Sequence, residues 1–404
     1  MTVHVGDQIQ VRAVRPATGG AVGRTDDGQV VFLRHALPNE VVRATVSEVS
    51  KSFVRADVGS VVEASAERVT PPCPYAHAGG CGGCDLQHAS TEAQLEWKSQ
   101  LVTEHLSRIA HLEWRVEVEE VGVPAQGSRT RLRCGVDAEG RLGLRPYRSN
   151  ELVSIDSCWI GASPFAEAFA EEWPGAEEVE LRAIGDTYFA VARHDVGDES
   201  QFSVSTLGGA ALPADTSTMV RVGAHDYRVG PLSFWQSHRA APDVLVRTVM
   251  EFADVAPGDH VVDLYSGVGL FTVPLAAAAG PTGRVTSVES SEDAVADAEF
   301  NTRNFRTVTL RDWRVTPRAI NDTVSAGDVV VLDPPRNGAG KAVASALVRR
   351  APRRIVYVSC DAATFARDLA VLLEGGYRLL QLRAFDLFPM TEHVELVGVL
   401  DAPL

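Results

Sequence analysis

The chain has 404 residues, of which 45% are hydrophobic and 23% are charged, so it can bury more than one globular core. At roughly 100–200 residues per domain, we expect about two to four domains. No run of about 18 apolar residues is present, which excludes a membrane-spanning helix. The opening MTVHVGDQIQ lacks the basic and apolar parts of a secretory signal, so we expect a cytoplasmic protein. The net charge of −15 argues against a general nucleic-acid binder.

Residues 1–63 are expected to form short strands separated by turns. The strand candidates are rich in Val, and glycine-containing turns lie between them; they span residues 8–14, 28–32, 40–49 and 53–62. Several short strands with no helix between them indicate a small β-barrel. Both an ordinary β-module and a nucleic-acid-binding OB-like barrel fit this pattern.

Residues 64–230 have a different composition. Segment 68–84 is rich in Pro, Gly and Cys and cannot form a regular element, whereas residues 91–112 carry apolar side chains at helical spacing, with Thr91 as a possible N-cap. From about residue 129 to 229 the chain is mainly β-structure. Residues 129–148 hold six arginines against two carboxylates, which predicts a basic surface within an acidic protein.

From residue 231 to the C-terminus, short apolar strands alternate with helices. The strands are expected at 260–265, 284–289, 328–333 and 354–359, with helices at 293–304 and 340–350 among the segments between them. This alternation is typical of a parallel sheet covered on both faces. The last two apolar runs, 377–385 and 393–400, have no helix between them and predict an antiparallel pair.

A glycine turn and an acidic residue indicate a cofactor pocket. Gly267 and Gly269 follow the first strand of this region, and Glu289 ends the second, where an acid can bind both hydroxyls of a ribose. Thr272 stands where a dinucleotide fingerprint has Gly or Ala, and the turn lacks the Lys-Ser/Thr of a P-loop. S-adenosylmethionine therefore suits the pocket better than NAD or ATP. Asp333-Pro-Pro, at the end of the next clear strand, resembles the substrate-facing motif of base methyltransferases.

Two reactive residues are expected at the same edge of the sheet. Cys360 directly follows the strand at 354–359, and Glu395 begins the returning strand of the final hairpin. A thiolate that adds to carbon 6 of a pyrimidine makes carbon 5 nucleophilic enough to attack a methylsulfonium. A base must then remove the proton from carbon 5. Cys360 as nucleophile and Glu395 as base therefore predict methylation of carbon 5 of an unstacked pyrimidine.

Four other cysteines form a second candidate site. Cys73, Cys81 and Cys84 lie in the Gly/Pro loop, and Cys158 follows later in the chain. Four thiolates suit either zinc or an iron–sulfur cluster, and their spacing does not decide between the two. Radical S-adenosylmethionine chemistry is disfavoured, because its Cys-x3-Cys-x2-Cys loop is absent. Cys134, on an expected strand, is interpreted as structural.

Taken together, these motifs resemble the RNA uridine-5-methyltransferase family over nearly the whole chain. The resemblance implies that residues 1–63 form a TRAM domain, an RNA-binding β-barrel, and that the four cysteines hold a 4Fe–4S cluster, as in the ribosomal-RNA branch. The run Phe234-Trp-Gln236 is similar to the family's Phe-x-Gln segment, which implies that Gln236 contacts the cofactor or the target uracil. Further matches to cofactor-site positions are Tyr265, Glu289 and Asp333.

The motifs around the reactive residues are the most specific part of the resemblance. Segments 359–364 and 388–395 resemble the family's nucleophile and base motifs. The chain departs from the family's pattern at His238, where Asn is common, and at Asp361-Ala362, where Asn-Pro is common. Leu270 replaces a residue that is polar in some relatives, and the gap of seven residues after Cys73 is longer than in one branch.

We therefore expect an α/β protein with a TRAM/OB-like barrel (residues 1–63), a central β-rich iron–sulfur domain (64–230) and a Rossmann-like S-adenosylmethionine methyltransferase domain (231–404), on which the helix at 91–112 packs. The expected enzyme methylates carbon 5 of a specific uridine in structured RNA, with 23S ribosomal RNA favoured over transfer RNA. It is expected to act as a monomer without membrane or obligate protein partners.

Other functions explain the sequence less completely. An NAD-dependent oxidoreductase leaves Asp333-Pro-Pro and the pair Cys360 and Glu395 unexplained. A non-catalytic RNA-binding iron–sulfur protein would not need those two residues. A DNA cytosine methyltransferase normally places its cysteine in a Pro-Cys motif near the fourth strand, where this chain has Asp-Pro-Pro.

Overall fold

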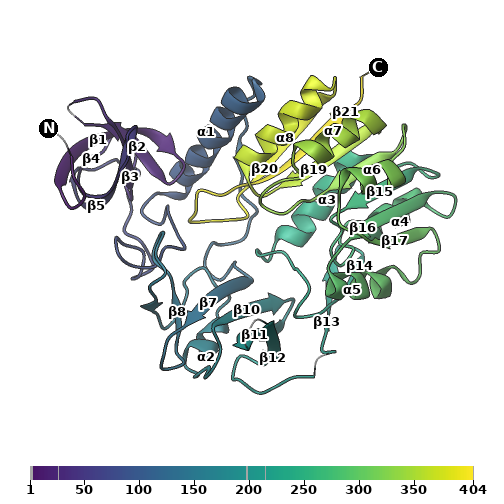
Figure 1. The fold of residues 1–404 in the computed structure, drawn as a ribbon, viewed down its shortest axis with the longest axis horizontal. Coiled ribbons are helices and arrows are strands. Elements are labelled where there is room, and N and C mark those ends of the chain that lie inside the picture. The colour runs from purple at the N-terminus through teal and green to yellow at the C-terminus, as the bar shows by residue number, and fades with distance from the viewer. Residues whose placement is uncertain (1–2, 26, 197–198, 214, 404) are drawn as a thin grey trace.

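Three β-structures follow one another along the chain, seen in a computed structural model that describes residues 3–25, 27–196, 199–213 and 215–403. A closed barrel comes first, a six-stranded antiparallel sheet second, and an eight-stranded sheet third. In Figure 1 the long helix α1 (Thr91–Ala110) lies between the barrel and the helices of the large sheet. Among the described residues, no helix is both long and apolar enough to cross a membrane.

The barrel contains five strands in the order β1-β2-β3-β5-β4, which closes its edges; they span Gln8–Ala17, Gly20–Arg24, Val30–Arg34, Val41–Val49 and Phe53–Glu63. The sequence predicted four of these strands and missed β2. The turn between β1 and β2 needs positive φ at Gly19 and Gly20, of 81° and 135°. The glycines that looked like the end of a strand therefore form a tight hairpin.

Helix α1 connects the barrel to the large sheet. Its N-cap is Ser90, whose Oγ accepts a hydrogen bond from the Ala93 amide at 3.2 Å, so the expected cap at Thr91 was wrong by one residue. Val102 and Leu106 are buried in the core that also covers one face of the large sheet, where α1 packs on α8 (Ala362–Glu374). The chain then adds the short strand β6 (Val118–Glu119) to the edge of that sheet.

The central sheet has the order β12-β11-β10-β7-β8-β9. Its strands span Arg131–Val136 (β7), Leu142–Leu144 (β8), Val153–Ser154 (β9), Glu178–Ile184 (β10), Thr187–Val196 (β11) and Glu199–Ser205 (β12), and the short helix α2 covers Phe165–Phe169. The arginines of 129–148 do not form the free basic surface that their count predicted. Four of them face carboxylates within 4 Å: Arg131, Arg133, Arg141 and Arg148. Arg131 and Arg133 pair across the sheet with acids of β10, Arg141 pairs with the neighbouring Asp137, and Arg148 pairs with Glu48 of the barrel.

The eight-stranded sheet has the order β17-β16-β15-β18-β19-β21-β20-β6. The first five of these strands are parallel and β21 is antiparallel, as expected for the final hairpin. The strands not yet located span His260–Leu264 (β15), Arg284–Glu289 (β16), Val308–Asp312 (β17), Val329–Leu332 (β18), Arg354–Ser359 (β19), Arg378–Phe385 (β20) and Glu395–Asp401 (β21). The edge strand β17 had not been predicted.

Both faces of the large sheet are covered, as alternate residues of its strands show. Val261 and Val329 belong to one core with α3 and α4, whereas Val262 and Val330 belong to a second core with α1, α6, α7 and α8. These helices and α5 span Ala241–Ala253 (α3), Thr272–Ala279 (α4), Glu292–Thr302 (α5), Pro317–Thr323 (α6) and Lys341–Arg350 (α7).

A two-stranded hairpin, β13 (Thr218–Val222) with β14 (His225–Val229), packs on the same side as α3. The Tyr227 hydroxyl donates to the Leu270 carbonyl at 2.9 Å, and Arg228 pairs with Asp297 on α5 at 2.8 Å. The hairpin, α1 and β6 all precede residue 231 and all contribute to the structure around the large sheet. The domain boundaries at residues 63 and 230 stay predictions.

Gly20→Ala is expected to destabilise the barrel by about 2–4 kcal/mol, because a Cβ at this positive φ would lie 2.4 Å from the Leu33 carbonyl oxygen. Gly28→Ala is the matched control: its φ is +88°, but nothing lies within 4 Å of the added Cβ, so only about 1–2 kcal/mol of backbone strain is expected. Urea unfolding followed by circular dichroism measures both. Equal losses of stability in the two variants would contradict this account of the turn.

Candidate active site and four-cysteine site

Five of the predicted site residues come together at one edge of the large sheet. Tyr265, Asp333 and Cys360 directly follow β15, β18 and β19, Glu289 ends β16, and Glu395 begins the antiparallel β21. In an open α/β sheet this carboxyl edge is where ligands bind. The strand order therefore assembles residues that lie up to 130 positions apart in the chain.

The pairing of β19 with β21 sets Cys360 beside Glu395. Ser359 and Leu396 are direct partners in the antiparallel register, so Cys360 and Glu395 occupy the next position along the ladder. Cys360 is partly exposed and Glu395 is 4% exposed. Burial raises the pKa of the Cys360 thiol to about 12, and the nearby Glu395 and Asp333 carboxylates act in the same direction. Without a ligand, this thiol keeps its proton at neutral pH.

Burial also perturbs the acids at this edge. It raises the pKa of Asp333 and, together with the Asp333 charge, raises the pKa of Glu395 well above its usual value. Asp263, at the end of β15, has its pKa raised to about 7 by burial and accepts a hydrogen bond from the Thr272 hydroxyl at 2.5 Å. Three carboxyls with raised pKa at one edge, none of them in an ion pair among the described residues, are typical of a functional site.

The glycine turn has an open side toward the edge of the sheet. Gly267 has a φ of +54°, and a Cβ added there would meet nothing within 4 Å. Tyr265, two residues earlier, also has positive φ, of 60°. The carboxylate of Glu289 accepts hydrogen bonds from the amide of Gly267 at 2.9 Å and from those of Ser290 and Ser291 at 2.6 and 2.8 Å. These bonds hold the glutamate at the rim of the turn.

Gln236 reaches the same place from outside the sheet. Its side-chain amide nitrogen lies 3.5 Å from Asp333 Oδ2. Its backbone carbonyl accepts a hydrogen bond from the Thr130 hydroxyl at 2.6 Å. One cavity is lined by this segment, by the glycine turn and by the acid after β18: Phe234, Trp235, Gln236, Tyr265, Ser266, Gly267, Val268, Leu270, Phe271 and Asp333. Most of the predicted cofactor residues thus line one cavity. The exceptions are Gly269, which lies within the glycine turn with a φ of 89°, and Glu289, which is hydrogen-bonded to that turn.

The departures from the family's sequence pattern have local structural roles. Asp361 caps α8 by accepting a hydrogen bond from the Thr364 amide at 2.9 Å, a role that Asn also fills. His238 is 2% exposed, and its Nδ1 accepts a hydrogen bond from the Ala240 amide at 3.1 Å. Asp361 therefore conserves the start of the helix that follows Cys360.

Several residues that support the site were not predicted from the sequence. Arg336, which follows Asp333-Pro-Pro, contacts His393 at 2.7 Å and lowers the pKa of Cys360 against the effect of burial. Lys98 of α1 is fully buried and donates to Asp386 and to the Phe388 carbonyl. A lysine at a buried position of a predicted helix was the signal that could have revealed this contact.

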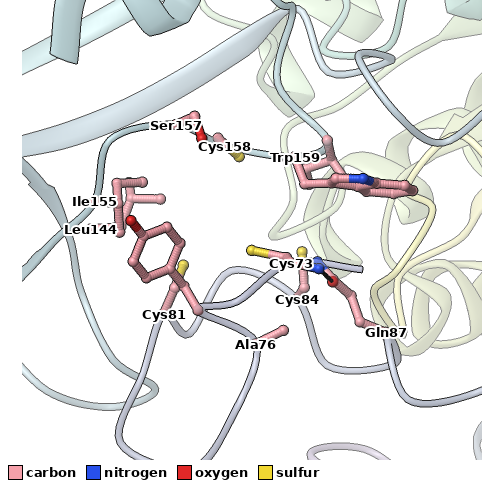
Figure 2. A pocket seen from close by; sticks show the side chains of 12 residues that line it. Cys73, Ala76, Cys81, Cys84, Gln87, Leu144, Ile155, Ser157, Cys158 and Trp159 are labelled. Atoms are coloured by element: carbon pink, nitrogen blue, oxygen red, sulfur yellow. Dashed lines mark hydrogen bonds between the residues drawn. The ribbon is translucent and has the colours of Figure 1, made fainter. Parts of the chain in front are cut away.

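The four predicted metal-ligating cysteines line a second cavity. Figure 2 shows Cys73, Cys81, Cys84 and Cys158 around a common space, beside Gln87 and Trp159. All four are free thiols. Burial raises the pKa of Cys81, of Cys158 and of Cys84, the last to about 12, whereas the nearby Arg129 guanidinium lowers all three. No three donors among the described His, Cys, Asp and Glu residues converge as ligands of one metal ion.

Cys134 does not line this cavity, although it packs in the same core as Cys81 and Cys158. It is fully buried on β7, in the core of the central sheet with Leu132 and Val179. Burial raises the pKa of its thiol well above the usual value. Its surroundings agree with a structural role, and it serves below as a control for the other cysteines.

Comparisons with known proteins agree with this arrangement. A family model described as tRNA (uracil-5-)-methyltransferase matches residues 318–402, which include Cys360 and Glu395, and a TRAM domain model matches residues 10–58 in the barrel. A model of protein-L-isoaspartate(D-aspartate) O-methyltransferase matches residues 222–316. In fold, the chain is similar to a tRNA (uracil-54, C5)-methyltransferase of Pyrococcus abyssi in complex with S-adenosyl-L-homocysteine, with a TM-score of 0.71, 24% identity, and 96% and 99% of the two chains covered.

Curated relatives match over nearly the full length. An uncharacterized RNA methyltransferase of Streptomyces coelicolor is 40% identical, with 98% of this chain and 93% of the relative covered. The 23S rRNA (uracil(1939)-C(5))-methyltransferase of Acinetobacter baylyi is 30% identical, with 94% and 90% covered. With its TRAM barrel and its S-adenosylmethionine methyltransferase fold, the chain belongs to the family of RNA uracil-5-methyltransferases.

Proposed function

We propose that this enzyme methylates carbon 5 of one specific uridine in 23S ribosomal RNA through a covalent adduct between Cys360 and the uracil, with Glu395 as the base. The observation that carries the proposal is the register of β19 and β21, in which Cys360 and Glu395 are neighbours. A nucleophile and a base must reach adjacent ring atoms, carbon 6 and carbon 5, and side chains paired across two strands have that spacing.

The proposed reaction has three chemical steps. The partly exposed Cys360 thiol gives its proton to solvent, and its sulfur forms a bond to carbon 6 while the ring electrons move to the carbonyl oxygen at position 4 as an enolate. Carbon 5 then attacks the methyl group of S-adenosylmethionine, the bond between that methyl group and sulfur breaks, and S-adenosylhomocysteine leaves. Glu395 removes the proton from carbon 5, and the electron pair expels the Cys360 thiolate and restores the ring. The raised pKa of Glu395 makes its carboxylate a stronger base than a solvent-exposed one.

The cofactor is proposed to lie against the glycine turn. Glu289 would accept hydrogen bonds from the ribose hydroxyls, because its carboxylate is already oriented at the rim by backbone amides. Tyr265, Gly267 and Gly269 would border the adenosine part, and Asp333 the end of the cofactor nearest the uracil. Gln236, beside Asp333, would contact the base or the cofactor.

Ribosomal RNA is favoured as substrate by the relative from Acinetobacter baylyi, whose name specifies 23S rRNA and which matches 94% of this chain. Transfer RNA is the second candidate, since a tRNA enzyme shares the fold. Mapping 5-methyluridine in total RNA, with and without the gene, distinguishes them: a single missing modification in 23S rRNA is expected, and a missing modification in transfer RNA would select the second candidate.

We also propose that Cys73, Cys81, Cys84 and Cys158 hold a 4Fe–4S cluster. Their thiols line one cavity, and four thiolates are the ligand set of a 4Fe–4S cluster as well as of a structural zinc ion. The resemblance to the ribosomal-RNA branch favours the cluster. Arg129 beside three of them would favour the thiolate form that ligation requires. Such a cluster supplies either a structural cross-link or a one-electron centre.

Cys360→Ala is expected to lower methyl transfer by about 10⁴-fold or more, because no other group can add to carbon 6. Tritium release from RNA that contains 5-tritiated uridine measures the reaction. Cys134→Ala, which removes a buried thiol far from the sheet edge, is the matched control and should keep its activity. Release that persists in Cys360→Ala would overturn the adduct mechanism.

Glu395→Gln is expected to accumulate a covalent protein–RNA adduct, because methylation can proceed while removal of the carbon-5 proton cannot. A slow-migrating band on a denaturing gel, absent in the double variant with Cys360→Ala, reports the adduct. Glu374→Gln alters an exposed carboxyl at the end of α8 and is expected to turn over without that band. An inactive Glu395→Gln protein that forms no adduct would remove Glu395 from the role of base.

Protein purified without oxygen is expected to show a broad visible absorption band, with about four iron and four sulfide per chain. Alanine at any one of the four cysteines should abolish or bleach the band, whereas Cys134→Ala should leave it unchanged. Zinc in place of iron and sulfide, measured by metal analysis, would contradict the cluster.

A further inference from the structure

The loop that directly precedes the proposed base is held by the cysteine loop, the segment that carries Cys73, Cys81 and Cys84. This catalytic loop, residues 386–394, connects β20 to β21. At its tip, the Met390 carbonyl accepts hydrogen bonds from the amides of Asp85 and Leu86, both at 2.9 Å. These two residues directly follow Cys84, and Met390 itself has a positive φ of 65°. The conformation of the catalytic loop thus depends on backbone groups adjacent to a cysteine of the second cavity.

Helix α1 holds the same loop from another side. The Gln94 side chain accepts a hydrogen bond from the Met390 amide at 3.0 Å, and the Lys98 ammonium donates to the Phe388 carbonyl at 3.0 Å. Both side chains are buried. The tip of the loop is therefore clamped between a regular helix, which is rigid by itself, and the cysteine loop, which has no regular secondary structure.

A second chain of hydrogen bonds runs from Cys158 to Gln236. The Cys158 carbonyl accepts from the Gly161 amide at 3.0 Å, and the neighbouring Ile160 carbonyl accepts from the Arg129 amide at 2.8 Å. The next residue, Thr130, bonds the chain at Gln236 and Ser237, through its hydroxyl at 2.6 Å and its amide at 3.0 Å. The backbone at Gln236 is thus held in place by hydrogen bonds that lead back to the segment of Cys158.

We infer that the four-cysteine site positions the reacting groups: when its cysteines are joined through a common ligand, it fixes the catalytic loop and the Gln236 segment relative to each other. The cofactor turn is bonded differently, since Tyr265 and Ser266 donate to the Val288 carbonyl, and Gly267 donates to Glu289. Loss of the ligand should therefore loosen the base and Gln236 and leave the cofactor turn in place. This inference rests on the proposed roles of Glu395 and Gln236.

Hydrogen–deuterium exchange on protein purified without oxygen tests the inference. In Cys84→Ala and Cys158→Ala, the amides of Asp85, Leu86 and Thr130, which donate to the Met390 and Ser237 carbonyls, are expected to exchange about tenfold faster or more. Amides in 386–394 and 234–239 should also exchange faster, because these segments lose the contacts that hold their conformation. Amides in 265–269 and 284–291 should be unchanged. Cys134→Ala is the matched control and should exchange like the unaltered protein.

Removing iron from the folded, unaltered protein with a chelator repeats the comparison without a substitution. Faster exchange confined to the amides of Asp85, Leu86 and Thr130 and to 386–394 and 234–239 supports the inference. Unchanged exchange there, or an equal increase in the cofactor turn, would overturn it, the latter by showing general loosening. None of these measurements uses RNA, so a wrong uridine or a wrong adduct mechanism would appear in the tritium and gel assays and leave the exchange result unaffected.

Discussion

Strand β21 runs antiparallel between β19 and β20, and this insertion decides what the carboxyl edge of the sheet can do. A parallel strand would bring its carboxyl end there, whereas β21 brings its first residue, Glu395, beside Cys360. Because side chains alternate between the two faces of a strand, a slip of one residue would turn Glu395 away from the thiol. The buried residues on both faces of β21, among them Leu396 and Val397 in separate cores, hold the register in place.

The edge concentrates carboxyl groups that form no ion pair among the described residues. Asp263 and Glu395 are buried, Asp333 is partly exposed, and loss of contact with water raises the pKa of each. In the proposed reaction the cofactor brings a positive sulfonium beside these groups. A cation next to Asp333 favours its carboxylate and offsets the repulsion that this charge exerts on Glu395. Binding of the methyl donor would then also lower the pKa of Glu395 toward its usual value. Cofactor binding and formation of the carboxylate base would thus be coupled.

The sequence was sufficient for the parts of the site that depend on strand order. Motifs at strand ends must meet at one edge of a parallel sheet, so Gly267, Glu289, Asp333 and Cys360 could be placed together without coordinates. It was insufficient where contacts join distant segments. Nothing local shows that Asp85 and Leu86 bind Met390, or that Lys98 lies against Asp386, because each pair depends on how α1 and the cysteine loop pack. The strand β2 was missed for a local reason: Gly19 and Gly20 were interpreted as a turn that separates longer strands, and the short strand that begins at Gly20 was not recognised.

The arginines of the central sheet show why a local charge count was a poor guide to RNA binding. Arg131 and Arg133 are within 4 Å of carboxylates on β10, and Arg148 is within 4 Å of Glu48 of the barrel. An arginine paired in this way contributes little long-range attraction to a phosphate backbone. The net charge of −15 predicts weak electrostatic affinity for RNA in general. In the proposed reaction, selection of the substrate would therefore depend on the shape of the RNA, because only an unstacked uracil could reach Cys360.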